Sequence, residues 1–156
     1  MNLFLTLIIF VGLILMIAYL AKTKKRSNAA DTPWPYYAKK PLTNPEQVLY
    51  HRLVAAMPEC IVLAQVQLSR ILGVKKGHKF HEWNNRINRM SVDFVVCLKD
   101  STVVAAVELD DGTHSKSERV EADAKKDRAL KAAGVPVIRW NVAALPDADT
   151  IRQAFA

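Results

Sequence analysis

Residues 92–113 read VDFVVCLKDSTVVAAVELDDGT, and this stretch specifies the centre of the fold. Two apolar strands are expected here, joined by a turn near Asp100 and Ser101. Each strand carries one carboxylate, Asp93 or Glu108, where a core strand usually carries an aliphatic side chain. Alternate residues of a strand face the same side of a sheet, so the pairing of the two strands determines where these acids point.

The register of this hairpin depends on the length of its loop. A loop with an even number of residues, two or four, places Asp93 opposite Glu108, with Asp110 one step beyond. An odd loop sets Asp93 against Val107 and mixes polar and apolar residues on both faces, so we expect an even loop. The apolar face then holds Val92, Phe94, Val96, Leu98, Val103, Ala105, Val107 and Leu109. The face with the acids holds Asp93, Val95, Cys97, Val104, Ala106 and Glu108.

Two neighbouring carboxylates on a mostly apolar face repel each other and lose hydration. A divalent metal ion is the usual reason why a protein tolerates such a pair, and oxygen ligands favour Mg²⁺ or Mn²⁺ over zinc. We therefore expect Asp93 and Glu108 to hold one of these ions. The alternative is two solvent-facing acids on a half-exposed sheet. Val95, Val104 and Ala106 on the same face favour a covered site.

The N-terminal segment predicts a membrane anchor. Residues 3–20 are almost wholly apolar and contain no charged residue. As a helix they rise about 27 Å, close to the roughly 30 Å hydrocarbon core of a bilayer. The basic residues that follow place the N-terminus outside and the remainder of the chain in the cytoplasm. A cleaved signal peptide is the competing interpretation, but no basic residue precedes the apolar run.

The chain is expected to have three parts. Residues 1–26 form a transmembrane signal anchor with a basic flank, residues 27–40 a linker, and residues 41–156 one compact domain. The net charge is +7, of which the four basic residues after the apolar run supply +4, so the remainder is only mildly basic. No CxxC pair is present, which argues against a zinc site built on cysteine.

The domain is expected to contain a helix, three strands, a helix, a strand and a final helix. A capping box at residues 43–46, closed by Glu46, starts the first helix, and Pro58 ends it. The other elements are a strand at 61–68, an irregular basic segment at 70–89, the hairpin, a helix at 117–133, a strand at 135–140 and a helix at 147–155. This order predicts an α/β fold with a mixed sheet flanked by helices and a parallel last strand.

The order of the acidic residues along the chain resembles that of a known group of proteins. Glu46 in the first helix, Asp93 on one strand and Glu108-Leu-Asp110 on the next resemble the PD-(D/E)XK nuclease-like superfamily. The closer resemblance is to the bacterial family called domain of unknown function 2726, which is similar to very-short-patch-repair endonucleases. That resemblance covers about residues 41–140. It is carried by VDFVV at 92–96, VELDDGTH at 107–114 and AGVPVIR at 133–139.

The resemblance implies a restriction-endonuclease-like fold and magnesium-dependent hydrolysis of phosphodiester bonds. Asp93 and Glu108 match the paired acids that hold magnesium, and the Leu109 carbonyl completes the protein ligands. Glu46 matches an acid that helps to bind the metal or to position water. His114 matches a histidine that acts in proton transfer.

The sequence departs from the superfamily at one position. A lysine normally stands two residues after the second acid, where this chain has Asp110. An aspartate cannot stabilise the negative charge that develops on the phosphate. Lys116, Lys125 or Lys126 are left to supply the positive charge, or His114 to assist. The expected catalytic residues are Glu46, Asp93, Glu108, Asp110, His114 and Lys126.

The basic segment at residues 70–89 is the expected contact with nucleic acid. It carries six Lys and Arg residues against one acid, Glu82, with Phe80 and Trp83 among them. Basic side chains contact phosphates, and aromatic ones stack on exposed bases. The residues expected to bind nucleic acid are Lys75, Lys76, Lys79, Trp83, Arg86 and Arg89. A solvated loop and contact with anionic lipid headgroups are the alternatives.

Two hypotheses follow for the function. The first is a metal-dependent nuclease, anchored in the bacterial inner membrane by a single span, that cleaves cytoplasmic DNA or RNA, with DNA the favoured substrate. The second is a catalytically inactive module that binds nucleic acid or a protein partner at the inner membrane face. Asp93, Glu108 and His114 favour the first hypothesis, and Asp110 in place of lysine favours the second. We expect the first.

Overall fold

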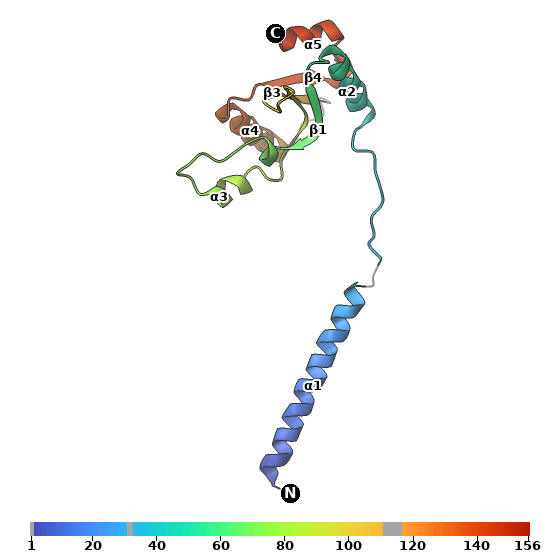
Figure 1. Cartoon of the computed structure of the whole chain (residues 1–156), viewed down its shortest axis with the longest axis vertical. Coiled ribbons are helices and arrows are strands. Elements are labelled where there is room, and N and C mark those ends of the chain that lie inside the picture. Colours follow the sequence, from blue (N-terminus) through green and yellow to red (C-terminus); the bar gives the residue numbers. More distant parts are fainter. Residues whose placement is uncertain (1, 31–32, 111–116) are drawn as a thin grey trace. The chain divides into compact units, whose positions relative to one another are not determined.

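The computed structural model describes residues 2–30, 33–110 and 117–156, and the chain divides into two compact units, Met1–Lys39 and Lys40–Ala156. The first unit contains helix α1 (Leu3–Ala30) (Figure 1). The expected helix is thus confirmed, and it continues past the apolar run through the basic residues. Among the described residues, however, no helix is both long and apolar enough to cross a membrane. The helical part of the expectation holds, and its membrane-spanning part is not supported.

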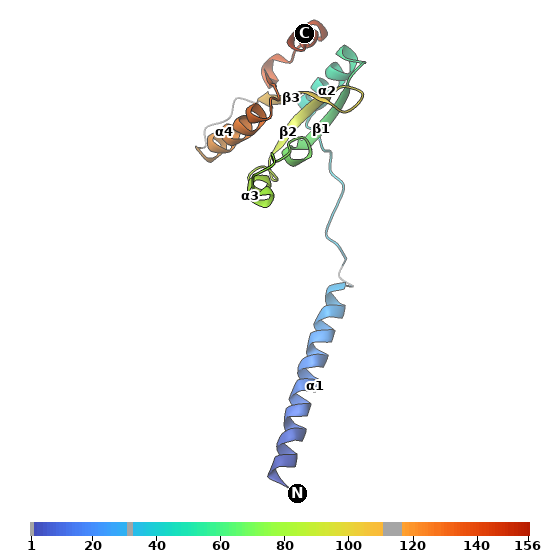
Figure 2. The ribbon, with the colours of Figure 1, turned by 60° about the vertical axis from the view of Figure 1, so that its left-hand side comes forward.

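The second unit is built on a four-stranded sheet in the order β1-β2-β3-β4, of which Figure 2 shows β1, β2 and β3 side by side. β1 (Ile61–Gln67), β2 (Ser91–Cys97) and β3 (Val103–Asp110) are antiparallel neighbours. β4 (Val137–Asn141) runs parallel to β3. Parallel neighbours need a long crossover connection, and helix α4 (Ser117–Ala132) provides it. The expected mixed sheet with a parallel last strand is confirmed.

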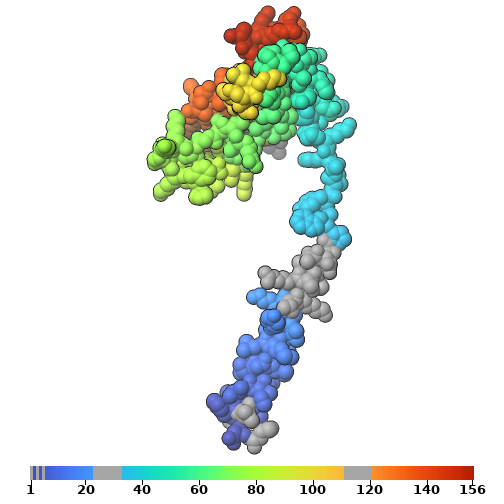
Figure 3. Space-filling model, viewed as in Figure 1, coloured from blue at the N-terminus to red at the C-terminus, as the bar shows by residue number. Residues whose placement is uncertain are grey.

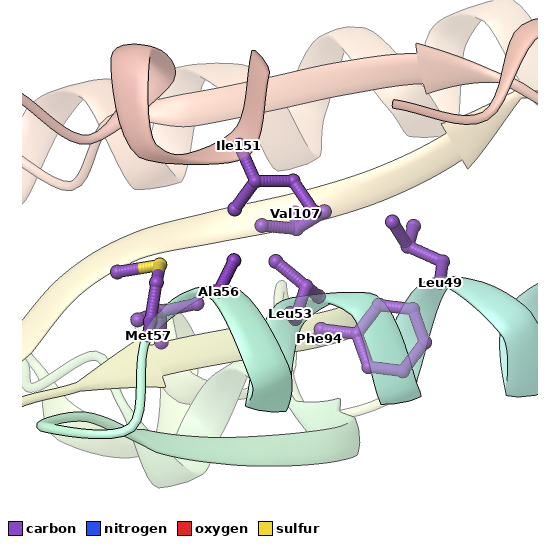
Figure 4. Close-up of a cluster of buried hydrophobic side chains, with 8 residues drawn as sticks. Leu49, Leu53, Ala56, Met57, Phe94, Val107 and Ile151 are labelled. Carbon is purple, nitrogen blue, oxygen red and sulfur yellow. The ribbon is translucent and has the colours of Figure 1, made fainter. Parts of the chain in front are cut away.

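Helices α2 (Asn44–Ala56) and α5 (Ala148–Ala154) pack against one face of the sheet. Their apolar side chains meet those of β2 and β3 in a buried cluster, which Figure 4 shows. This cluster consists of Leu49, Leu53, Ala56, Met57, Phe94, Val96, Val107 and Ile151. Burial of these side chains orients the sheet against α2 and α5.

Helix α4 covers the opposite face (Figure 2). Its fully buried Leu130 packs in a second cluster with Val95 and Ala106. Phe94 and Val95 are adjacent in β2 and point to opposite sides, so one cluster lies on each face. Asp93 has the parity of Val95, and Glu108 has that of Ala106. Both acids are therefore on the α4 face.

The hairpin reaches the expected register by an unexpected route. Phe94 pairs with Val107, as predicted. The loop, however, has three residues, 99–101, because the Leu98 N–H donates to the Thr102 carbonyl at 2.9 Å. The expectation of an even loop is wrong, and a β-bulge at Val104 restores the register by adding one unpaired residue to β3.

The same bulge reverses the two faces near the loop. Val104 packs with the α2–α5 cluster and Val103 with the α4 cluster, the opposite of the expected arrangement. An extra residue shifts the alternation of side chains by one, which explains the exchange. On the far side of the bulge, at Asp93 and Glu108, the predicted faces are correct.

The basic segment is more regular than expected. It contains a short helix, α3 (Phe80–Asn85). The first residue of the segment, Arg70, is also the last residue of a 3₁₀ turn, η1 (Leu68–Arg70). Six residues are too few to produce a helical periodicity that stands out in the sequence. A second 3₁₀ turn, η2 (Val142–Ala144), follows β4. Gly134, with a φ of +72°, ends α4 as predicted.

Candidate active site

Asp93 and Glu108 lie side by side in one pocket at the α4 face of the sheet. The pocket has a volume of about 560 Å³. Residues from β3, β4 and α4 complete its wall: Leu109, Asp110, Asp123, Lys126, Asp127, Arg139 and Asn141. The structure thus brings together four of the six expected catalytic residues, Asp93, Glu108, Asp110 and Lys126, together with Leu109.

Lys126 enters the pocket from α4. It lies four residues before Leu130, and residues four apart share one face of a helix, so the turn that buries Leu130 also directs Lys126 toward the acids. The Lys126 ammonium nitrogen is 2.6 Å from Glu108 Oε1, and the two side chains are 14% and 10% exposed. Among the described residues, Glu108 Oε1 has no well-directed hydrogen bond. The contact with Lys126 is therefore an ion pair with poor hydrogen-bond direction.

Asp93 is held by the backbone of the neighbouring strand. The Leu109 N–H donates a hydrogen bond to Asp93 Oδ2 at 2.8 Å. This bond fixes the carboxyl group next to Glu108, which precedes Leu109. The position follows from the pairing of β2 with β3, because the two acids are opposite each other in the register that the bulge restores.

Gln65 is a part of this site that sequence reasoning missed. Its amide nitrogen donates to Glu46 Oε1 at 2.9 Å, and a weak polar interaction of its side chain with the Asp93 carboxyl group favours the charged form of that group. Gln65 has a φ of +52°, which costs about 1 kcal/mol or more for a residue with a side chain. A strained glutamine that joins two acids connects Glu46 on α2 to the pocket.

Both central acids are harder to ionise than an ordinary carboxyl group. Burial raises the pKa of Asp93, and the negative charge of Glu46 raises it further, against the hydrogen bond from Leu109. Burial likewise raises the pKa of Glu108, and the charge of Asp93 adds to this effect, although Lys126 acts in the opposite direction. The two acids destabilise each other's charged form, as expected for neighbours that lack a full complement of positive charge.

The pocket as a whole is negatively charged. Its described wall carries five carboxylates, those of Asp93, Glu108, Asp110, Asp123 and Asp127, against two cations, Lys126 and Arg139. Arg139 is already paired with Asp127 across the rim. An excess of three negative charges attracts cations and repels a phosphate group that arrives alone.

The donor atoms suit an oxygen-binding cation. Among the described residues, no group of three or more His, Cys, Asp or Glu side chains could hold a metal ion. A metal site here would therefore use the pair Asp93 and Glu108, with a backbone carbonyl such as that of Leu109. Mg²⁺ usually keeps several waters and takes one or two carboxylates, so this sparse donor set fits it.

Two expected site residues are not in the pocket. Glu46 does not line it, and its Oε2 accepts hydrogen bonds from the Thr43 N–H at 2.5 Å and the Thr43 hydroxyl at 2.6 Å. The structural role of Glu46 at the start of α2 is thus confirmed. His114 lies outside the described residues, as does Lys116. Of the other lysines considered, Lys125 pairs with Glu121 at 2.9 Å on the exposed side of α4.

The expected nucleic-acid contacts divide into two groups. Lys75, Trp83 and Arg86 line a second pocket beside α4. The other three, Lys76, Lys79 and Arg89, are exposed and do not line it.

Comparison with known proteins gives a family but no characterised relative. Searches of curated proteins and of solved structures find no significant match. One family model, described as a protein of unknown function (DUF2726), matches residues 38–156, a range that includes every residue of the pocket. The chain therefore belongs to the DUF2726 family.

Proposed function

We propose that this domain is a metal-dependent nuclease of the PD-(D/E)XK type that hydrolyses phosphodiester bonds, with DNA as the favoured substrate. The observation that supports this most is the 2.6 Å contact between the Lys126 ammonium and Glu108 Oε1, beside Asp93. Two acids and a lysine converge in one pocket although the lysine of the sequence motif is replaced by Asp110. A helix supplies the positive charge that the strand lacks.

Asp93 and Glu108 would hold Mg²⁺ or Mn²⁺, with the Leu109 carbonyl as a third protein ligand. When bound, such an ion neutralises the phosphate, lowers the pKa of an attacking water and stabilises the leaving oxygen. The raised pKa values of both acids and the excess negative charge of the pocket favour binding of a cation. Without a cation, the same charge keeps a phosphodiester out.

Lys126 stabilises the negative charge that develops on the phosphate during hydrolysis. An ammonium group that is already fixed and largely shielded from water interacts more strongly with that charge than a solvated one. Arg139 is held at the rim by Asp127 and adds positive charge where the nucleic acid enters. Gln65 is fixed by its hydrogen bond to Glu46, and its side chain interacts with Asp93 from the side of α2.

The second candidate function is a nucleic-acid-binding or protein-binding module without catalysis. It is favoured by the same ion pair, since Lys126 can compensate Glu108 permanently and leave no need for a metal. The two functions differ in a direct assay. The full chain is incubated with plasmid DNA, linear duplex, single-stranded DNA and RNA, each with Mg²⁺, Mn²⁺ or EDTA. Cleavage that requires the metal supports the nuclease, and intact substrates in every mixture, with a folded protein, support the binding module.

Gln65 provides a test of how Asp93 is positioned. We expect Gln65→Ala to lower the metal-dependent cleavage rate by about tenfold, because Asp93 loses the polar side chain that interacts with it and helps to orient it. The matched control is Gln67→Ala on the same strand, because the Gln67 amide donates to the Asn88 carbonyl instead. Cleavage by both variants is measured at equal folded fraction, verified by circular dichroism. Equal rates for the two variants would exclude Gln65 from the site.

A further inference from the structure

A second pocket lies between residues 72–87 and the C-terminal half of α4, with a volume of about 470 Å³. Figure 3 shows the yellow-green segment that forms one side of it at the surface of the domain. The apolar part of the lining consists of small or aliphatic side chains, among them those of Leu72, Ala129 and Ala132. The polar and aromatic residues of the wall are Lys75, His78, Trp83, Arg86, Lys125 and Arg128.

The charge of this wall is the opposite of that in the acid pocket. It carries four Lys and Arg side chains and, among the described residues, no carboxylate. Arg86 and Lys125 form ion pairs with Glu82 and Glu121, but both pairs are more than half exposed. Exposed pairs contribute little free energy, so an anion can take over these cations at small cost. In the described part of the chain, no acid pairs with Lys75 or Arg128.

An aromatic ring is fixed among these cations. The Trp83 indole is 43% exposed, and the Arg86 guanidinium carbon lies 4.1 Å from its ring centroid. The His78 ring meets the indole edge-on, with centroids 5.7 Å apart. A ring held from two sides has little freedom left to lose when a flat ligand stacks on it. Apolar lining residues, a fixed aromatic ring and four Lys and Arg side chains match the alternation of base and phosphate in a nucleic acid.

We propose that this second pocket binds an unpaired base of a single-stranded nucleic acid, with the flanking phosphates on its four Lys and Arg side chains. This inference rests on the nuclease function proposed above and specifies its substrate as single-stranded or locally unpaired. Helix α4 joins the two pockets, because Lys126 and Asp127 line the acid pocket while Lys125 and Arg128 line this one. A base within a duplex is stacked and paired, so it cannot enter such a pocket without being extruded.

The test is binding of the full chain to fluorescein-labelled oligonucleotides in EDTA, followed by fluorescence anisotropy. A single strand of thymidines is compared with an abasic strand of equal length and charge, and with a duplex. The pocket predicts a Kd at least about fivefold lower for the thymidine strand than for the abasic one, since stacking on one aromatic ring contributes on that scale. Equal affinities for the two single strands would show attraction by charge alone and overturn the base pocket.

A pair of variants tests the location. Ala132 is exposed, lines the second pocket and lies in α4, where both Glu and Lys are good helix formers. Ala132→Glu is expected to raise the Kd for the thymidine strand at least about fivefold, because it repels phosphate, whereas Ala132→Lys, of similar size, leaves it unchanged or lowers it. Trp83→Ala is expected to remove the preference for thymidine over the abasic strand, and Trp83→Phe to keep most of it. An Ala132→Glu variant that binds as well as the parent protein places the contact elsewhere and refutes the proposal.

The outcomes separate this site from the proposed reaction. Preferential binding of the thymidine strand without cleavage in Mg²⁺ or Mn²⁺ keeps the base pocket and rejects the nuclease. Cleavage with equal affinity for thymidine and abasic strands keeps the nuclease and rejects the base pocket. Anionic phospholipid vesicles are a further competitor. Three results together would show that the pocket serves a lipid surface and that the inference is wrong. The parent protein binds the vesicles, Ala132→Glu abolishes that binding, and the protein does not prefer the thymidine strand to the abasic one.

Discussion

Asp93→Asn is expected to abolish metal-dependent cleavage and, at neutral pH in the absence of metal, to stabilise the protein. Asparagine keeps an oxygen that accepts the hydrogen bond from the Leu109 N–H, so the local structure is preserved. It removes the charge that would hold the metal, and we expect the cleavage rate to fall by about 10³-fold, equivalent to about 4 kcal/mol. It also removes a half-buried negative charge beside Glu108, which should raise the free energy of unfolding by about 0.5–2 kcal/mol.

The stability gain has a definite pH dependence. Burial raises the pKa of Asp93 in the folded protein above its value in the unfolded chain, so the unfolded chain ionises first as the pH rises. The carboxyl group therefore lowers the free energy of unfolding most at pH values above its pKa in the folded protein. Well below about pH 4 the group is protonated in both states, and the parent protein and Asp93→Asn should differ little. Their difference should appear as the pH rises above that value and then remain constant.

Urea unfolding of both proteins between pH 3.5 and 8, in EDTA, measures this difference. Asp149→Asn serves as the matched control, because Asp149 is an exposed acid on α5 that pairs only with the neighbouring Arg152 among the described residues. The control should change neither the cleavage rate nor the pH profile. An Asp93→Asn variant that cleaves normally would remove Asp93 from the reaction, and a loss of stability at pH 7 would show that its charge is well compensated.

The sequence was sufficient for those features of the fold that depend on local patterns. The capping box at Thr43 and the helix stop at Gly134 predicted the boundaries of α2 and α4 closely. The alternation in β2 and β3 placed Asp93 and Glu108 on one face, because a wrong register would have exposed a complete apolar face to water. The β-bulge was not predictable in this way. A bulge and an odd loop together leave the same register at the acids as an even loop, so the pattern at Asp93 cannot distinguish them.

Contacts between distant parts of the chain were the least accessible to sequence reasoning. Gln65 reads as an ordinary polar residue in a strand, and only the folded chain places its amide between Glu46 and Asp93. The sequence offers three lysines for this positive charge, Lys116, Lys125 and Lys126. The four-residue spacing between Lys126 and Leu130 distinguishes Lys126 from the other two lysines. This spacing is informative only when the face of α4 that packs on the sheet is known. The positive charge of Lys126 thus reaches the pocket through tertiary packing. A sequence motif within one strand does not include this residue.

Substitution of Lys126 gives the most direct test of the proposed reaction. We expect Lys126→Met to lower the cleavage rate by about 10²- to 10³-fold, the usual effect of removing a fixed group that stabilises developing charge. Loss of the ammonium also leaves the buried Glu108 without its cation, which costs about 1–3 kcal/mol at neutral pH. This cost should shrink as the pH falls and Glu108 takes up a proton, because its pKa is raised further when Lys126 is absent. Lys126→Arg keeps the charge and should retain the stability.

A lysine returned to the strand should compensate for the lysine removed from the helix. Position 110 lines the same pocket as Lys126, so a lysine there can direct its ammonium to the same acids. We expect Lys126→Met combined with Asp110→Lys to recover about tenfold or more of the lost cleavage rate, while Asp110→Lys alone gains nothing, since Lys126 already supplies the charge. Cleavage is compared for the four proteins at equal folded fraction with Mn²⁺. If Lys126→Met cleaves as fast as the parent protein, the ion pair with Glu108 is only structural, and the charge for the reaction must come from another residue.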